Sequence, residues 1–199
     1  MTVEEQKKKK NRRIRREFIE WGVIIAIGAF LYLTGLHTEV IGFVQGLVLK
    51  TGLIKPKISV EEPISKADYN FRLVDEEGNI LEGVDLKGKT VFINLWATWC
   101  PPCIAEMPDI NRLYNEVASD DIVFLMISLD DDFNKASAFI QKKKYNFNIY
   151  RYVSTAPMIF YSKIIPTSFV ISPEGNIVVR KEGMAKYDSP SFKEFLKSL

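Results

Sequence analysis

The stretch that decides the fold is Thr90–Cys103, which reads TVFINLWATWCPPC. Its first half is apolar except for Asn94, a pattern typical of a strand that is buried on both faces of a sheet. The run leads directly into Cys100 and Cys103, the only two cysteines of the chain. A strand that delivers a CxxC pair to the start of a helix is suited to thiol–disulfide exchange. We therefore predict that Cys100 and Cys103 form a redox-active disulfide.

The two cysteines are expected to have different roles because of their positions on the helix that we predict from about residue 101 to residue 117. The dipole and the free N–H groups of a helix N-terminus stabilise a thiolate. Cys100 precedes the helix and is expected to be the more exposed, so we predict that it is the attacking nucleophile. Cys103 is expected to be buried one turn further in and to resolve the mixed disulfide.

Half of a zinc site and a pair of inert buried cysteines are the alternative interpretations of this CxxC pair. A structural zinc ion normally takes four ligands. The chain has no third cysteine, and its single histidine, His37, lies at the end of a distant apolar segment. We therefore expect no metal site and no cofactor other than the Cys100–Cys103 disulfide, and the placement of the pair after a strand disfavours inert cysteines.

The charge of the chain is unevenly distributed. Its 199 residues carry a net charge of +2 and are sufficient for one ordinary domain with additional segments. Residues 1–17 hold eight Lys and Arg against three Glu, so this tail carries +5 and the remaining residues sum to −3. The body of the protein is therefore not basic, and we expect no nucleic-acid partner.

An uncharged run of sixteen residues, 21–36, follows the basic tail. With its edges it reaches about 20 residues, roughly the length that crosses a bilayer. The basic residues before it predict a cytoplasmic N-terminus and a translocated chain after about residue 37. A cleavable signal peptide is the alternative, but its apolar region would be long and no small-residue cleavage site follows. We predict a basic cytoplasmic tail over 1–17 and an uncleaved single-pass anchor over 18–38.

The rest of the chain is predicted to contain a juxtamembrane segment with a linker, 39–66, and one domain, 67–199. Apolar residues over 40–48 recur at helical spacing, which indicates an amphipathic helix on the membrane or on the domain, or else an extension of the anchor. From residue 67, short strands alternate with helices. The expected strands are 69–74, 80–81, 90–96, 122–129, an edge strand 148–153, 167–171 and 177–180. This pattern predicts an α/β sandwich with a mixed sheet.

Three segments of the predicted domain carry a resemblance to a known family: Phe92–Cys103, Glu106-Met107-Pro108 and Ile165–Ile171. They are similar to the thioredoxin superfamily and, within it, to the membrane-anchored TlpA/ResA-like thiol–disulfide oxidoreductases of bacteria. The resemblance covers about two thirds of the chain. It implies a thioredoxin-like sandwich with a mixed central sheet over 67–199.

The resemblance also implies a binding site for the substrate. Pro166 matches the family's cis-proline, which lies opposite the disulfide and presents the backbone of its neighbour, Ile165, to an incoming strand. An ordinary trans proline at the start of a strand is the alternative. Trp99, Pro101 and Pro102 lie next to the cysteines in the sequence, and we predict that they belong to the same substrate-binding surface.

Glu106 is the third catalytic candidate. In the family, an acidic residue at this position is associated with tuning the pKa values of the cysteines and with relaying protons. The alternative is a first-turn carboxylate that interacts favourably with the helix dipole. Thioredoxins carry a buried aspartate where this chain has Asn94, which cannot take a proton, so Glu106 is the better candidate for the proton acceptor.

The resemblance implies a reductase on the outer, periplasmic side of the bacterial inner membrane. Its partners would be disulfide-containing exported proteins, and a transmembrane thiol donor would supply its electrons. Two alternatives stay open at this stage. One is an oxidant or isomerase of exported proteins that uses the same residues, and the other is a non-enzymatic docking module with a thioredoxin fold.

Overall fold

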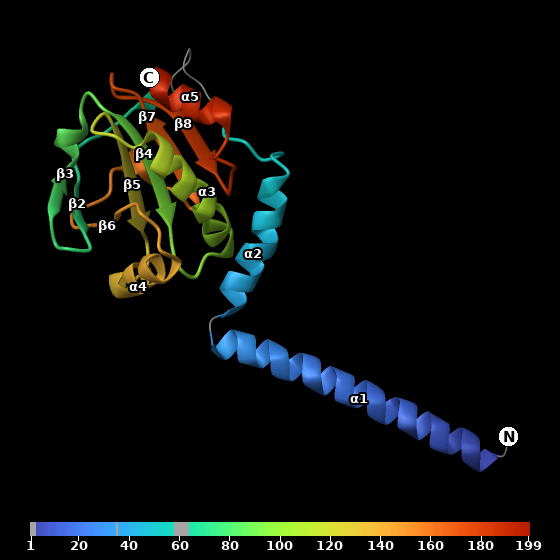
Figure 1. The fold of residues 1–199 in the computed structure, drawn as a ribbon. Helices are drawn as coiled ribbons and strands as arrows, with labels where there is room; N and C mark the ends of the chain where they lie inside the picture. The colour runs from blue at the N-terminus through green and yellow to red at the C-terminus, as the bar shows by residue number, and fades with distance from the viewer. Residues whose placement is uncertain (1–2, 35, 58–63) are drawn as a thin grey trace. The chain divides into compact units, whose positions relative to one another are not determined.

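The computed structural model describes residues 3–34, 36–57 and 64–199, with the backbone alone for residues 3–15 (Figure 1). The chain forms two compact units, Met1–Val40 and Ile41–Leu199. The predicted division at residues 17, 38 and 66 stays a prediction. Helix α2 (Leu36–Lys50) contributes residues to both units.

The first unit consists mainly of helix α1 (Val3–Leu33). The predicted basic tail and most of the predicted anchor therefore form one continuous helix. Its apolar side chains after Glu17, such as Phe18, Ile25 and Leu33, are exposed. Among the described residues, no single helix combines the length and the apolarity of a membrane span. Arg16–Leu33 and Leu36–Lys50 meet these requirements only when they are taken together as a broken pair.

The second unit is built on a mixed sheet with the strand order β1-β8-β7-β4-β5-β6-β2-β3. The strands are β1 (Ser65–Lys66), β2 (Arg72–Asp75), β3 (Ile80–Glu82), β4 (Thr90–Trp96), β5 (Ile122–Ser128), β6 (Ile149–Tyr152), β7 (Thr167–Ile171) and β8 (Asn176–Glu182). β4 pairs in parallel with β5 and antiparallel with β7, so it lies in the middle of the sheet, as its apolar sequence predicts.

The two faces of the sheet are covered differently. Helices α3 (Pro101–Val117), α4 (Phe133–Lys143) and α5 (Pro190–Ser198), labelled in Figure 1, pack on one face. Alternate β4 residues on this face, such as Phe92 and Trp96, are fully buried. The other face packs against the short 3-10 helices η1 (Gly83–Leu86) and η2 (Met158–Phe160). The predicted thioredoxin-like sandwich with a mixed sheet is confirmed.

The position predicted for β6 is wrong. We expected an edge strand there, but β6 lies between β5 and β2. The reason is that β2, from the hairpin β2–β3, pairs antiparallel with β6 and extends the sheet by two strands. At the other end, Ser65 and Lys66 of β1 pair with β8, so the last residues of the predicted linker lie in the sheet.

Phe92 is a direct test of this core because it is fully buried and its ring contacts Phe124, Tyr187 and Phe192. We expect Phe92→Ala to lower the free energy of unfolding by about 3–5 kcal/mol, since it leaves a cavity among these rings. The control is Val84→Ala on half-exposed η1, which should change it by less than about 0.5 kcal/mol. Denaturant unfolding followed by tryptophan fluorescence measures both. Equal effects would contradict the assignment of Phe92 to the core.

Candidate active site

Cys100 and Cys103 form a disulfide at the first turn of α3, with an S–S distance of 2.08 Å. Cys100 is the N-cap residue, and its Sγ accepts a hydrogen bond from the Cys103 N–H at 3.3 Å. Pro101 and Pro102 occupy the first two helical positions, where a missing N–H costs little. Cys100 is 4% exposed and Cys103 is 1% exposed. Cys100 is therefore the more accessible of the two, as expected, although both are nearly buried in the disulfide.

The loop before β7 faces this disulfide. The Ile165–Pro166 peptide bond is cis, as the resemblance implies. The Sγ of Cys100 lies 3.7 Å from the carbonyl oxygen of Ile165. The Pro166 carbonyl accepts a hydrogen bond from the Gly183 N–H at 2.8 Å, which ties the loop to the end of β8. A backbone carbonyl is thus held beside the sulfur that we predict to be the nucleophile.

The predicted substrate-binding side chains lie around Cys100. Trp99 is exposed, and Pro101 and Pro102 are half-buried. Ile164, on the loop that carries Pro166, is also exposed. The surface next to the disulfide is therefore apolar. The role of these residues in binding stays a prediction.

Glu106 is completely buried. Its Oε1 accepts a hydrogen bond from the Asn94 amide at 2.7 Å, and its Oε2 accepts one from the Ala185 N–H at 3.0 Å. Burial raises the pKa of Glu106 to about 8, and the hydrogen bonds from Ala185 and Asn94 and the charge of Lys181 oppose this rise only in part. The carboxyl group is therefore mostly neutral at pH 7. Because Glu106 follows Cys103 by three residues on α3, the two share one face of the helix.

The buried side chain of Asn94 links Glu106 to β7. The Asn94 amide also donates to the Ser168 hydroxyl at 2.8 Å, and these two residues are register partners in the sheet. The Tyr187 ring is fully buried nearby, and both its burial and the charge of Glu106 raise the pKa of its hydroxyl. The sequence pointed to Asn94 only as a residue that cannot take a proton. Its contact with Ser168 carried no sequence signal.

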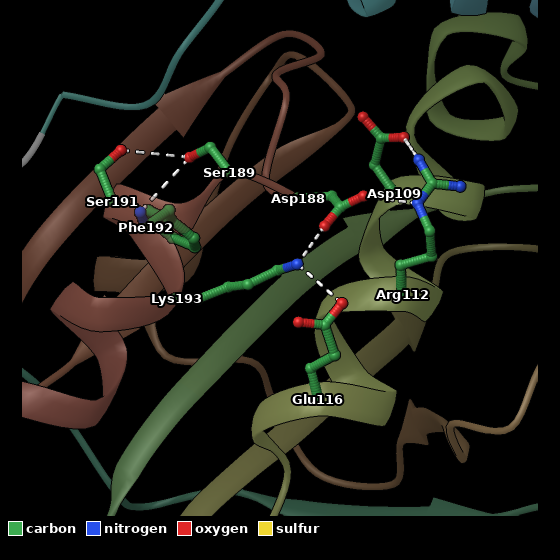
Figure 2. Close-up of polar contacts among 8 residues, drawn as sticks. All are labelled: Asp109, Arg112, Glu116, Asp188, Ser189, Ser191, Phe192 and Lys193. Atoms are coloured by element: carbon green, nitrogen blue, oxygen red, sulfur yellow. Dashed lines mark hydrogen bonds and ion pairs between the residues drawn. The ribbon is translucent and has the colours of Figure 1, made fainter.

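The 183–189 loop, which supplies the Ala185 N–H, is held against α3 by ion pairs. Figure 2 shows Asp188 between two cations, Arg112 of α3 and Lys193 of α5. Arg112 also pairs with Asp109, and Lys193 also pairs with Glu116 at 2.8 Å (Figure 2). Burial alone would raise the pKa of Asp188, but the hydrogen bonds from Arg112 and Lys193 outweigh it and lower the pKa. These ion pairs hold in place the loop whose Ala185 N–H donates to Glu106.

Asp130 is a site residue that the sequence analysis missed. Its carboxylate accepts hydrogen bonds from the Thr98 hydroxyl at 2.6 Å and from the Thr98 N–H at 3.0 Å. It therefore anchors the loop that carries Trp99 and Cys100. The only available signal was the run of three aspartates at 130–132, which does not indicate which of them faces the loop.

The residues that the structure describes contain no group of three or more His, Cys, Asp and Glu that could hold a metal ion. The histidine His37 lies in the first unit, and both cysteines are in the disulfide. The acidic residues near the site, Glu106 and Asp109, have the hydrogen-bond and ion-pair partners described above. The described side chains at this site supply a disulfide and a buried carboxyl group.

The chain is similar to known proteins in sequence and in fold. The AhpC/TSA family model matches residues 64–180. A thiol-disulfide oxidoreductase ResA of Bacillus cereus is 34% identical over 134 residues, which cover 67% of this chain and 76% of that protein. ResA of Bacillus thuringiensis subsp. konkukian is 30% identical over 192 residues, covering 96% and 98%. The crystal structure of StoA from Bacillus subtilis aligns with a TM-score of 0.52 and 26% identity, over 63% of this chain and 94% of that one.

The raised pKa of Glu106 predicts a pH dependence of stability. The folded protein keeps a proton on Glu106 that the unfolded chain, with a pKa near 4.5, releases. Stability should therefore fall as pH rises from about 4.5 to about 8, with a slope of up to about 1.4 kcal/mol per pH unit from this group. Glu106→Gln should remove this part of the slope, as measured by denaturant unfolding at a series of pH values.

The matched control is Glu82→Gln on the exposed strand β3, which should leave the slope unchanged. A wild-type slope that persists in the Glu106→Gln protein would show that the carboxyl group is not neutral in the folded state.

Proposed function

Since the chain belongs to the AhpC/TSA family and is a thiol–disulfide oxidoreductase of the ResA type, we propose that it is a membrane-tethered reductase of protein disulfides. The observation that supports this most directly is the Cys100–Cys103 disulfide at the start of α3, with the Ile165 carbonyl 3.7 Å from the Cys100 sulfur. An oxidant or isomerase of exported proteins would use the same residues, and the two differ in the reduction potential of the pair.

In the proposed reaction, the reduced pair transfers two electrons to a partner. The Cys100 thiolate attacks one sulfur of the partner disulfide, forms a mixed disulfide and releases a partner thiolate. Cys103 then loses its proton and attacks the Cys100 sulfur, which releases the second partner thiolate and leaves the Cys100–Cys103 disulfide. Glu106, on the same helix face as Cys103, would have given its proton to Cys103 when the pair was reduced. The resulting carboxylate is the proposed acceptor of that proton at this step. A dithiol donor then reduces the pair again.

We propose that the partner binds as an extended segment along the loop that contains Pro166. The backbone of Ile165 would hydrogen-bond to this segment, as an added strand does at a sheet edge. The apolar surface of Trp99, Pro101 and Pro102 would cover the partner disulfide and exclude water from the exchange. This binding mode needs no cofactor, no metal ion and no nucleic acid.

The proposed location is the outer side of the bacterial inner membrane. Residues 18–38 would be a single-pass anchor, with the basic residues 1–17 in the cytoplasm and the redox domain outside. The match with ResA of Bacillus thuringiensis extends over 96% of this chain, so the N-terminal region belongs to the shared sequence. The partners would then be exported proteins with disulfides, and a transmembrane thiol protein would supply the electrons.

Trapping the mixed disulfide tests the assigned roles of the cysteines. We expect the reduced Cys103→Ser protein to form a stable one-to-one adduct with an added disulfide-bonded peptide, because Cys100 can attack but nothing resolves the product. Mass spectrometry under non-reducing conditions detects the adduct. The matched control, Cys100→Ser, should form it at least about tenfold more slowly, because Cys103 is the less accessible cysteine. A faster adduct at Cys103 would reverse the assignment.

The reduction potential of the pair tests the direction of electron flow. We expect a value below about −230 mV for the full chain, measured by equilibration with glutathione or dithiothreitol buffers, because dithiol reductants lie in that range. A value above about −180 mV would contradict a reductase and would indicate an oxidant or isomerase.

A further inference from the structure

Part of helix α2 packs on the first turn of the redox helix α3 within the second unit. A Cβ atom at Gly42 would lie 3.0 Å from the Pro101 carbonyl oxygen and 3.2 Å from a methyl carbon of Ile104. Gly46, one turn later, faces the Ala105 carbonyl, and Leu49 is 1% exposed. These α2 residues are spaced four and three apart and so share one side of the helix. This side, the docked side, rests on the turn that follows Cys100.

The chain after α2 is also fixed to the redox domain. Ile54 packs against the main core, and its carbonyl accepts a hydrogen bond from the Lys186 N–H at 2.8 Å. Lys186 follows Ala185, whose N–H donates to Glu106. The segment from Gly42 to Ile54 therefore contacts both elements that surround the redox site, which are the start of α3 and the 183–189 loop.

The opposite side of α2 is apolar and exposed. Phe43, Val44, Leu47 and Val48 are between 46% and 69% exposed. They are spaced one and four apart, on the side of the helix away from the docked residues. Leu53, just after the helix, is 84% exposed. This outer side thus presents four large apolar side chains to its surroundings, and Leu53 adds a fifth just after the helix.

Positive charges lie at the end of α2 and in the segment that follows it. Lys50, Lys55 and Lys57 are exposed, and no acidic residue occurs between Ile41 and Lys57. An apolar helix side followed by lysines is the pattern of a segment that lies in the interface of an anionic membrane. A protein partner would instead be expected to meet a polar rim with hydrogen-bonding groups of both kinds. The observations therefore favour lipid as the occupant of this side.

We propose that residues 41–57 form a membrane-surface segment, with the outer side of α2 in the headgroup region of an anionic bilayer and the docked side holding the start of α3 beside it. The Cys100–Cys103 pair is then kept close to the membrane surface, where a dithiol donor embedded in the bilayer can reach it. This proposal goes beyond the N-terminal anchor. It gives the redox domain a second contact with the membrane, at the membrane surface.

The depth of spin labels in a bilayer, measured on the full chain, tests this proposal. Phe43→Cys and Leu47→Cys each carry a spin label, while the oxidised Cys100–Cys103 disulfide is protected from labelling. The matched control is Lys87→Cys, which precedes β4 at the end of the strand away from the disulfide. The protein is reconstituted in phosphatidylcholine bilayers with and without phosphatidylglycerol. Relaxation by oxygen and by a water-soluble nickel chelate then reports the depth of each label.

We expect the labels at 43 and 47 to lie about 5–10 Å into the headgroup and acyl boundary of the anionic bilayers, and the label at 87 to lie in water. Replacing Lys50, Lys55 and Lys57 together with Gln should make the labels at 43 and 47 shallower. Labels in water, labels at the bilayer centre, or labels shielded from both reagents by a second protein surface would each overturn the proposal.

This test is independent of the redox chemistry. The proposed reductase is tested by the peptide adduct of Cys103→Ser and by the reduction potential, and neither measurement depends on where α2 lies. A protein that exchanges disulfides while its labels at 43 and 47 lie in water would retain the proposed function and lose the membrane-surface segment.

Discussion

The burial of the Glu106 carboxyl group is the constraint on which the arrangement around the disulfide depends. A carboxyl group removed from water is costly unless it finds hydrogen-bond partners. Here the partners come from separate parts of the chain, the Asn94 amide of β4 and the Ala185 N–H of the 183–189 loop. The helix α3, the central strand and this loop are therefore held in one relative arrangement. The ion pairs of Arg112 and Asp188 hold the same loop from its exposed side.

Much of this arrangement could be predicted from the sequence, because it rests on side chains in a short local pattern. The buried strand β4, the helix after Cys100 and the disulfide are encoded within one continuous stretch, and the cis bond before Pro166 follows from the resemblance. The partners of Glu106 could not be predicted in the same way. Ala185 contributes only its backbone N–H, which every residue except proline has, so its sequence identity carries no signal.

The two errors of placement have a common physical origin. Strand β6 was expected at an edge, and residues 65–66 were expected in a linker, because strand pairing between distant segments leaves no local pattern. For helix α2, the sequence likewise did not show which side packs on the domain. Its docked side is made of Gly42, Gly46 and Leu49, and its outer side is also apolar. Periodicity therefore predicts a helix there, and only the contacts with Pro101 and Ile104 distinguish its two sides.

The pKa of Glu106 affects whether this group could exchange a proton with Cys103 when the disulfide is reduced and oxidised. With a pKa of about 8, the carboxyl group lies close to neutral pH, where a group can both donate and accept a proton without a large free-energy cost in either direction. When the disulfide is reduced, two thiolates form at the start of α3, and a neutral Glu106 can supply a proton to Cys103. When the pair is oxidised again, the same carboxylate can take that proton back. A surface glutamate with a pKa near 4.5 would serve poorly as the donor, because it would already have lost its proton at neutral pH. The burial that fixes the local structure would therefore also suit Glu106 to the proposed proton transfer.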